Sequence, residues 1–155
     1  MAKKLANDSK LENSSAVHEA LKPHFGYLLH KTSLLYKLES SKRLASLNIQ
    51  ACHFAALLII ESETSANQIQ ICSETGVDKA TMVKTIDHLQ NLKLVERVES
   101  KSDRRIKNLN LTKKGKRLLT QAKEIRAGYE KDFLDSLTSG EAKSIRKILL
   151  KLIEK

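Results

Sequence analysis

QICSETGVDKATMVKTIDHLQNLKLVER, residues 70–97, is the stretch of this sequence with the strongest structural signal. Apolar residues recur at helical intervals on both sides of Gly76, and glycine suits the left-handed turn that ends a helix. Asp78 is of a residue type favoured at a helix N-cap. The pattern therefore predicts a short helix over about 67–75, a turn, and a second helix over about 78–92. We expect the apolar face of the second helix to comprise Met82, Val83, Ile86 and Leu89.

The residues after this pair of helices predict two short strands around a charged turn. LVERVES (94–100) and RIKNLNL (105–111) have the composition of strands, and SKSDRR lies between or at their ends. Two helices with a glycine-bearing turn indicate a helix-turn-helix, and a following hairpin with a cationic tip is typical of a winged helix.

Such a motif predicts contacts with both grooves of duplex DNA. The second helix would present side chains that suit the major groove: Lys79, Ala80, Thr81, Lys84, Thr85 and His88. An arginine at the hairpin tip suits the narrow minor groove. Asp103 would hold a neighbouring guanidinium, of Arg97 or Arg105, in one orientation. The alternative is an ordinary solvated hairpin turn.

The distribution of charge supports a polyanionic partner. The formal net charge of the chain is +10, and the span 78–117 holds twelve Lys and Arg against five acidic residues, a net +7. A basic protein without such a partner would have its excess charge scattered. Aromatic residues make up 4% and Trp is absent, which argues against stacking on single strands or RNA.

Other classes of protein find little support in the sequence. The N-terminus lacks the apolar core of a signal peptide and no run approaches a membrane span, so we expect a cytoplasmic protein that does not bind membranes. Two cysteines and five histidines lack metal-ligand spacing, and no phosphate loop or nucleophile elbow occurs. We therefore expect no enzyme activity, no metal and no cofactor.

The remaining segments predict a mainly α-helical chain with a small β-hairpin wing. We expect a flexible basic segment (1–15), N-terminal dimerisation helices (16–47), a winged helix-turn-helix lobe (48–112) and C-terminal dimerisation helices (113–155). Within these, helices are expected from near Pro23 to about Leu44, over 50–62, from Thr112 to about Leu137, and after the capping box that Thr138 opens. The leucines of the terminal helices exceed what one small lobe could bury, which favours a homodimer.

Residues 48–155 resemble the MarR family of transcriptional regulators. The matching pieces are IQACHFAALLII, the helix-turn-helix stretch quoted above, SDRR of the wing and LNLTKKGKRLL after it. The resemblance implies a homodimer with two lobes that bind a palindrome, with Arg105 as the wing arginine and Asp103 as its organiser. Lys101, Arg104 and Lys107 would contact the DNA backbone. The chain departs from the family at Lys93, where glycine is usual, and the family's first strand is faint near Thr64–Ala66.

Members of the family often respond to a small aromatic acid, a phenolic compound or an oxidant. His30, Tyr36 and His53 are candidates for lining such an effector pocket, although each residue type is also common in a core or interface. Cys52 is the candidate redox sensor, because the first turn of a helix can activate a thiol. The alternative for Cys52 is a small buried side chain, and Cys72 is expected to serve packing.

These observations predict a sequence-specific, double-stranded-DNA-binding transcription regulator. We expect a repressor that binds a palindromic operator as a homodimer, with affinity modulated by a small molecule or a redox signal. The alternative is a nonspecific architectural DNA-binding protein, since basic charge alone supplies phosphate affinity.

Overall fold

A computed structural model describes residues 17–99 and 107–154 of the chain. The described part is mainly helical with one two-stranded antiparallel hairpin, so the predicted fold class is confirmed. The elements in chain order are η1 (Glu19–Leu21), α2 (Phe25–Leu44), η2 (Ala45–Leu47), α3 (Ala51–Ser62), α4 (Gln68–Thr75), α5 (Lys79–Asn91), β1 (Val95–Glu99), β2 (Lys107–Leu111), α6 (Lys113–Phe133) and α7 (Ser139–Ile153).

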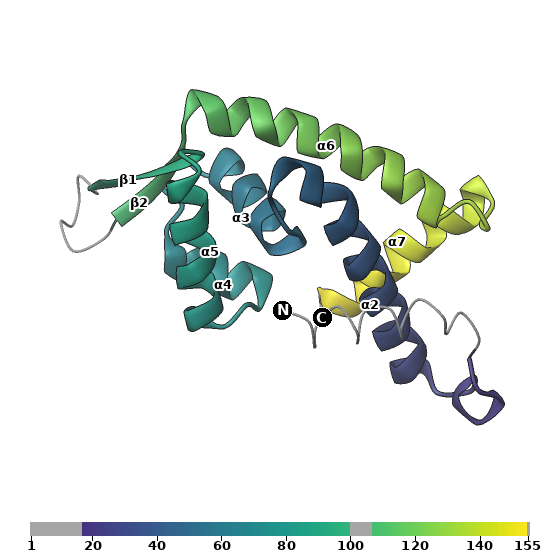
Figure 1. Ribbon diagram of the computed structural model, residues 1–155. Helices are drawn as coiled ribbons and strands as arrows, with labels where there is room; N and C mark the ends of the chain where they lie inside the picture. The colour runs from purple at the N-terminus through teal and green to yellow at the C-terminus, as the bar shows by residue number, and fades with distance from the viewer. Residues whose placement is uncertain (1–16, 100–106, 155) are drawn as a thin grey trace, which may run out of the picture.

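Two groups of elements are joined by the long helix α6. Figure 1 shows α4, α5 and the β1–β2 hairpin gathered near the start of α6, with α2 beneath its middle and α7 folded back from its far end. In the hairpin, Val95 pairs with Leu111 and Glu99 with Lys107. The hairpin thus directly connects the second helix of the helix-turn-helix with α6.

The core of the lobe forms around α3. In its AALLII run (55–60), Ala56 and Leu57 are both fully buried. The other elements each contribute apolar side chains to the same cluster, among them Ile71, Met82, Ile86, Leu89, Leu109 and Leu119. Because these residues belong to one buried cluster, the helix-turn-helix and the hairpin form one packed unit.

Side-chain caps set the starts of four helices. Asn67, Asp78, Thr112 and Thr138 each accept a hydrogen bond from a backbone N–H in the first turn, at 3.0, 2.9, 3.0 and 3.3 Å. The hydrogen bonds from Thr81 hold the pKa of the Asp78 carboxyl below its ordinary value. The predicted capping box at Thr138 is present, with Glu141 accepting the Thr138 N–H at 2.8 Å.

The C-terminal ends of the helix-turn-helix pair differ in chemistry. Gly76 ends α4 with a φ of 65°, as expected for a left-handed cap. Lys93, just after α5, adopts a φ of 58° although it carries a side chain. The backbone therefore makes the turn that glycine usually makes in the family, at a conformational cost.

Two expected details are absent or shifted. α6 ends at Phe133, before the predicted Leu137, because the chain then turns, with the Leu137 N–H donating to the Leu134 carbonyl at 2.9 Å. No strand forms at 64–66 among the described residues. Instead, the Leu109 N–H donates to the Ala66 carbonyl at 2.7 Å, and Asn67 and Asn108 form an isolated bridge.

Candidate nucleic-acid interface

The exposed face of α5 is the centre of the candidate interface. Asp78 caps this helix, and Met82, Ile86 and Leu89 anchor its opposite face in the core with no exposed area. The structure leaves Lys79, Ala80, Thr81 and Lys84 exposed on the outer side. Four of the six predicted recognition-helix residues are therefore brought together on one accessible surface.

Thr85 and His88 lie away from that surface in the structure, so the geometry does not support their prediction as DNA contacts. Thr85 is 3% exposed, and its hydroxyl donates to the Cys52 sulfur at 3.8 Å. The half-buried His88 stacks on His53, with ring centroids 4.5 Å apart, and its Nε2 lies 2.9 Å from the Asn48 carbonyl oxygen. Both residues face α3 and the loop before it.

Val83 and Asp87 take the places of those two residues on the outer face. Val83 was expected in the core but is 42% exposed, and the Asp87 side chain is 50% exposed. The helical period agrees with this placement but does not fix it. Met82, Ile86 and Leu89 lie three to four residues apart, whereas Val83 is displaced from that stripe by about 100°.

Asp87 also changes the expected role of Arg97. The Asp87 Oδ1 accepts a hydrogen bond from the Arg97 Nη2 at 2.9 Å, which ties the second helix of the motif to β1. Arg97 was expected as one of two partners for Asp103, and in the structure its partner is on α5. Sequence reasoning missed this pair because its members lie ten residues apart on different elements.

Most of the predicted wing contacts lie outside the described residues: Lys101, Asp103, Arg104 and Arg105. Lys107 is at the described end of the hairpin, where its Nζ lies 2.6 Å from the Glu99 carboxylate. This ion pair holds the pKa of Glu99 below its ordinary value. Lys107 is exposed at the edge of the wing, where Glu99 compensates its charge.

The three residues predicted to line an effector pocket have different neighbours. His30 is exposed on α2, and Tyr36 packs against Tyr129, with ring centroids 4.9 Å apart. His53 is 8% exposed, and its Nδ1 accepts the Gln50 N–H at 2.9 Å. Burial, together with the nearby His88, lowers the pKa of His53 to about 4. The structure therefore places His53 in the packing between α3 and α5.

The side chains of Cys52 and Cys72 are both partly exposed to solvent. Cys52 is partly buried beneath Thr85, and Cys72 packs against the hydrophobic core, as expected. Within the ranges 17–99 and 107–154, no three His, Cys, Asp or Glu side chains are grouped so that they could hold a metal ion.

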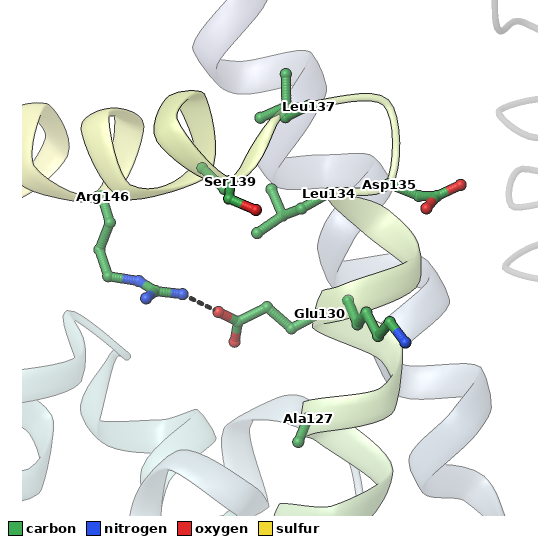
Figure 2. A pocket seen from close by; sticks show the side chains of 9 residues that line it. Ala127, Glu130, Leu134, Asp135, Leu137, Ser139 and Arg146 are labelled. Carbon is green, nitrogen blue, oxygen red and sulfur yellow. Dashed lines mark hydrogen bonds and ion pairs between the residues drawn. The ribbon is translucent and has the colours of Figure 1, made fainter.

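A hollow of about 500 Å³ lies at the junction of α6 and α7. Figure 2 shows Glu130 of α6 paired with Arg146 of α7 across it, with Leu134 and Leu137 near the turn between the two helices. None of the predicted effector residues lines this hollow. Its walls belong to the helices that were expected to form the dimer.

No single helix in the described part of the chain is long and apolar enough to cross a membrane. Phe25–Leu47 and Ala51–Ser62 reach that length and composition only as a pair, bent by 74°. α3, the second helix of this pair, buries five of its residues in the interior of the lobe.

A helix-turn-helix with a basic outer face, followed by an antiparallel hairpin that packs on the same core, defines a winged helix-turn-helix protein. Comparison with known families agrees: residues 47–106 match the family model described as MarR family. Over these residues the chain is similar to the MarR family, a family of transcriptional regulators.

Solved structures of this family have the same fold over most of the chain. The transcriptional repressor CouR, bound to a 23-mer DNA duplex, is 27% identical with a TM-score of 0.79, over 92% of this chain and all (100%) of that one. CouR from Rhodococcus jostii RHA1 bound to p-coumaroyl-CoA is 23% identical with a TM-score of 0.76, over 87% of this chain and 95% of that one. A mutant of MarR from E. coli complexed with operator DNA is 20% identical with a TM-score of 0.76, over 88% of this chain and 99% of that one.

Proposed function

We propose that this protein is a transcription regulator that binds a specific palindromic DNA operator as a homodimer. The observation that carries the proposal is the division of α5 into a fully buried stripe and an exposed outer face with Lys79, Thr81 and Lys84. Lysine donates to guanine or phosphate and threonine bonds either, so this face combines affinity with base reading.

Charge and family agree with this proposal. The span 78–117, with its net +7, includes α5, the hairpin and the start of α6. Arg105, which lies outside the described residues, would enter the minor groove, with Asp103 as its brace. CouR and E. coli MarR, which share the fold, have both been solved with DNA.

The dimer would form through α2 and α7. α7 has no buried residue in the single chain. Its apolar side chains Ile145, Ile148 and Leu152 are each more than 40% exposed. Phe25 at the start of α2 is 63% exposed. Apolar surface of this extent on two terminal helices is expected to be covered by a second copy, which would place two α5 helices on successive major grooves, about 34 Å apart.

Repression and response to a signal complete the proposal. Occupying a promoter represses transcription without further machinery, and CouR is itself a repressor. A small molecule bound near the dimer helices would change the spacing of the lobes and so their fit to two half-sites. The support for a ligand of this kind is CouR, which binds p-coumaroyl-CoA; a redox signal at Cys52 is the alternative input.

The first experiment is selection of duplexes from a random library by the purified protein, followed by footprinting on DNA that flanks its own gene. We expect an inverted repeat that is protected over two half-sites. Lys84→Ala should weaken binding to the selected duplex, and a lost base contact would narrow the difference between that duplex and a scrambled one by about 1–3 kcal/mol.

The competing function is nonspecific architectural binding. It predicts that selection enriches no sequence and that Lys84→Ala weakens binding to both duplexes equally, with a shallower salt dependence. Those results would replace the regulator by the architectural protein.

A further inference from the structure

We propose that Val83 determines operator specificity by contacting the C5 methyl group of a thymine in each half-site. The inference rests on the proposed function, because it assigns a base to one residue of the surface that is proposed to read DNA.

The exposure of Val83 singles it out. Within α5 it is the one large apolar side chain left exposed, at 42%, whereas Met82, Ile86 and Leu89 have no exposed area. Ala80 and Asp87, three residues before and four after it, are exposed on the same side of the helix, and Lys84 is exposed next to it. An exposed valine is also a weak helix former, so helix propensity gives no reason for this residue at the position.

The chemistry of Val83 selects its target. An isopropyl group neither donates nor accepts hydrogen bonds, and the one apolar group that the major groove offers is the thymine methyl. Against a cytosine amine or a guanine carbonyl, the same side chain would displace water and leave the base edge without a partner. Val83 therefore favours a T·A pair over the alternatives at the step it covers.

The neighbours of Val83 let it come close to the base. Ala80, one turn earlier, carries only a methyl group, so it leaves room for the helix to approach the groove. Asp87, one turn later, has its carboxylate directed to Arg97 at 2.9 Å. The Arg97 guanidinium compensates the negative charge that would otherwise oppose the approach to the phosphates.

A coupling experiment on a selected duplex tests this assignment. Each thymine is replaced in turn by uracil, which removes only the C5 methyl group. For the unchanged protein we expect one position in each half-site where uracil weakens binding about fourfold, the loss of one buried methyl group. V83A should weaken binding to the thymine duplex by at least as much, and should be insensitive to uracil at that same position.

Val98→Ala is the matched control, because Val98 is 41% exposed but lies on β1. At the position where uracil no longer affects V83A, uracil should still weaken the binding of Val98→Ala about fourfold. Circular dichroism and thermal unfolding should show V83A as stable as the unchanged protein, since the side chain leaves no cavity in the core.

Two results would overturn the assignment: no uracil position weakens binding, or V83A retains the full uracil penalty at every position. Either result leaves the proposed function intact, because both are measured on a duplex that the protein has selected. Failure to select any duplex would instead refute the proposed function.

Discussion

Gly115, at the end of the LTKKG segment (111–115), lies where the first turn of α6 packs against the backbone just before β1. A β-carbon at this position would lie 2.0 Å from the Leu94 carbonyl oxygen, a backbone atom that cannot move aside without moving the strand. The Thr112 hydroxyl donates to the neighbouring Lys93 carbonyl at 2.8 Å and accepts the Gly115 N–H. The glycine is therefore required by close packing and not by its backbone angles.

Gly115→Ala is expected to lower the free energy of unfolding by about 1–3 kcal/mol, the range for overpacking a filled site. Gly128→Ala in the same helix is the control, because a β-carbon there meets nothing within 4 Å. It should raise the free energy of unfolding by up to about 1 kcal/mol. Urea denaturation measures both, and equal effects of the two substitutions would contradict the packing explanation.

His53 makes stability depend on pH. Its pKa is about 4 in the folded protein and has the ordinary value of 6.5 in the unfolded chain, so the unfolded state binds more protons between these values. The stabilisation is complete above pH 6.5 and is lost as pH falls toward 4, by an amount on the order of 3 kcal/mol. Denaturation at a series of pH values measures this loss.

His53→Gln is the matched variant for that measurement. Glutamine can still accept the Gln50 N–H, as in a capping box, but it does not titrate. Its stability should fall less than that of the unchanged protein between pH 6.5 and 4. Parallel curves for the two proteins would show that other groups cause the acid sensitivity.

At the scale of elements, the phase of α5 decides which residues can face DNA. Leu57 of α3 is fully buried, as are Met82, Ile86 and Leu89, so packing against the core sets the rotation of α5. Thr85 and His88 then point toward α3, while Val83 and Asp87 point outward. Compared with the prediction, α5 keeps its boundaries but is rotated about its own axis. As a result, Val83 and Asp87 replace Thr85 and His88 on the face that could contact bases.

The Asp87–Arg97 pair links α5 to the hairpin, and its removal should affect DNA binding more than stability. Both side chains are at least one-third exposed, so the pair itself contributes at most about 1 kcal/mol to folding. Arg97→Ala leaves the Asp87 carboxylate uncompensated on the outer face, and affinity for DNA should fall about fivefold or more. Fluorescence anisotropy at fixed salt measures this.

Asp87→Asn in the Arg97→Ala background is the control for that prediction. It removes the unpaired charge, so part of the lost affinity should return. If the double variant binds no better than Arg97→Ala alone, the guanidinium acts through its own contact with DNA and not by compensating Asp87.

At the scale of the whole molecule, α7 is incomplete in a single chain. It is amphipathic and well capped, yet it buries none of its residues against the rest of the chain. Figure 1 shows it folded back from the far end of α6. The hollow beside it, with Glu130 and Arg146, adds to the surface that a second copy would cover.

Ile148→Asp is therefore expected to break the proposed dimer without unfolding the lobe, because Ile148 is 56% exposed in the single chain. Sedimentation velocity should show monomers at concentrations where the unchanged protein is dimeric, and operator affinity should fall at least tenfold. Lys147→Asp, one residue away on the polar face, should remain dimeric. A dimeric Ile148→Asp would exclude this face of α7 from the interface.

The order of the elements and the class of fold could be predicted from the sequence. Those features depend on local signals: Gly76 as a left-handed cap, Asp78, Thr112 and Thr138 as N-caps, and helical periods long enough to be recognised. Local signals act within a few residues along the chain, so one sequence is enough to read them.

Tertiary packing determines which side chains of α5 are accessible and which carboxylate Arg97 pairs with. Thr85 and His88 look like DNA contacts in the sequence, because threonine and histidine have suitable chemistry and follow Lys84 closely. Their burial depends on contacts with Cys52 and His53, more than thirty residues away along the chain. Contacts between distant segments fix the rotation of a helix about its own axis, and periodicity alone left that rotation uncertain by one residue.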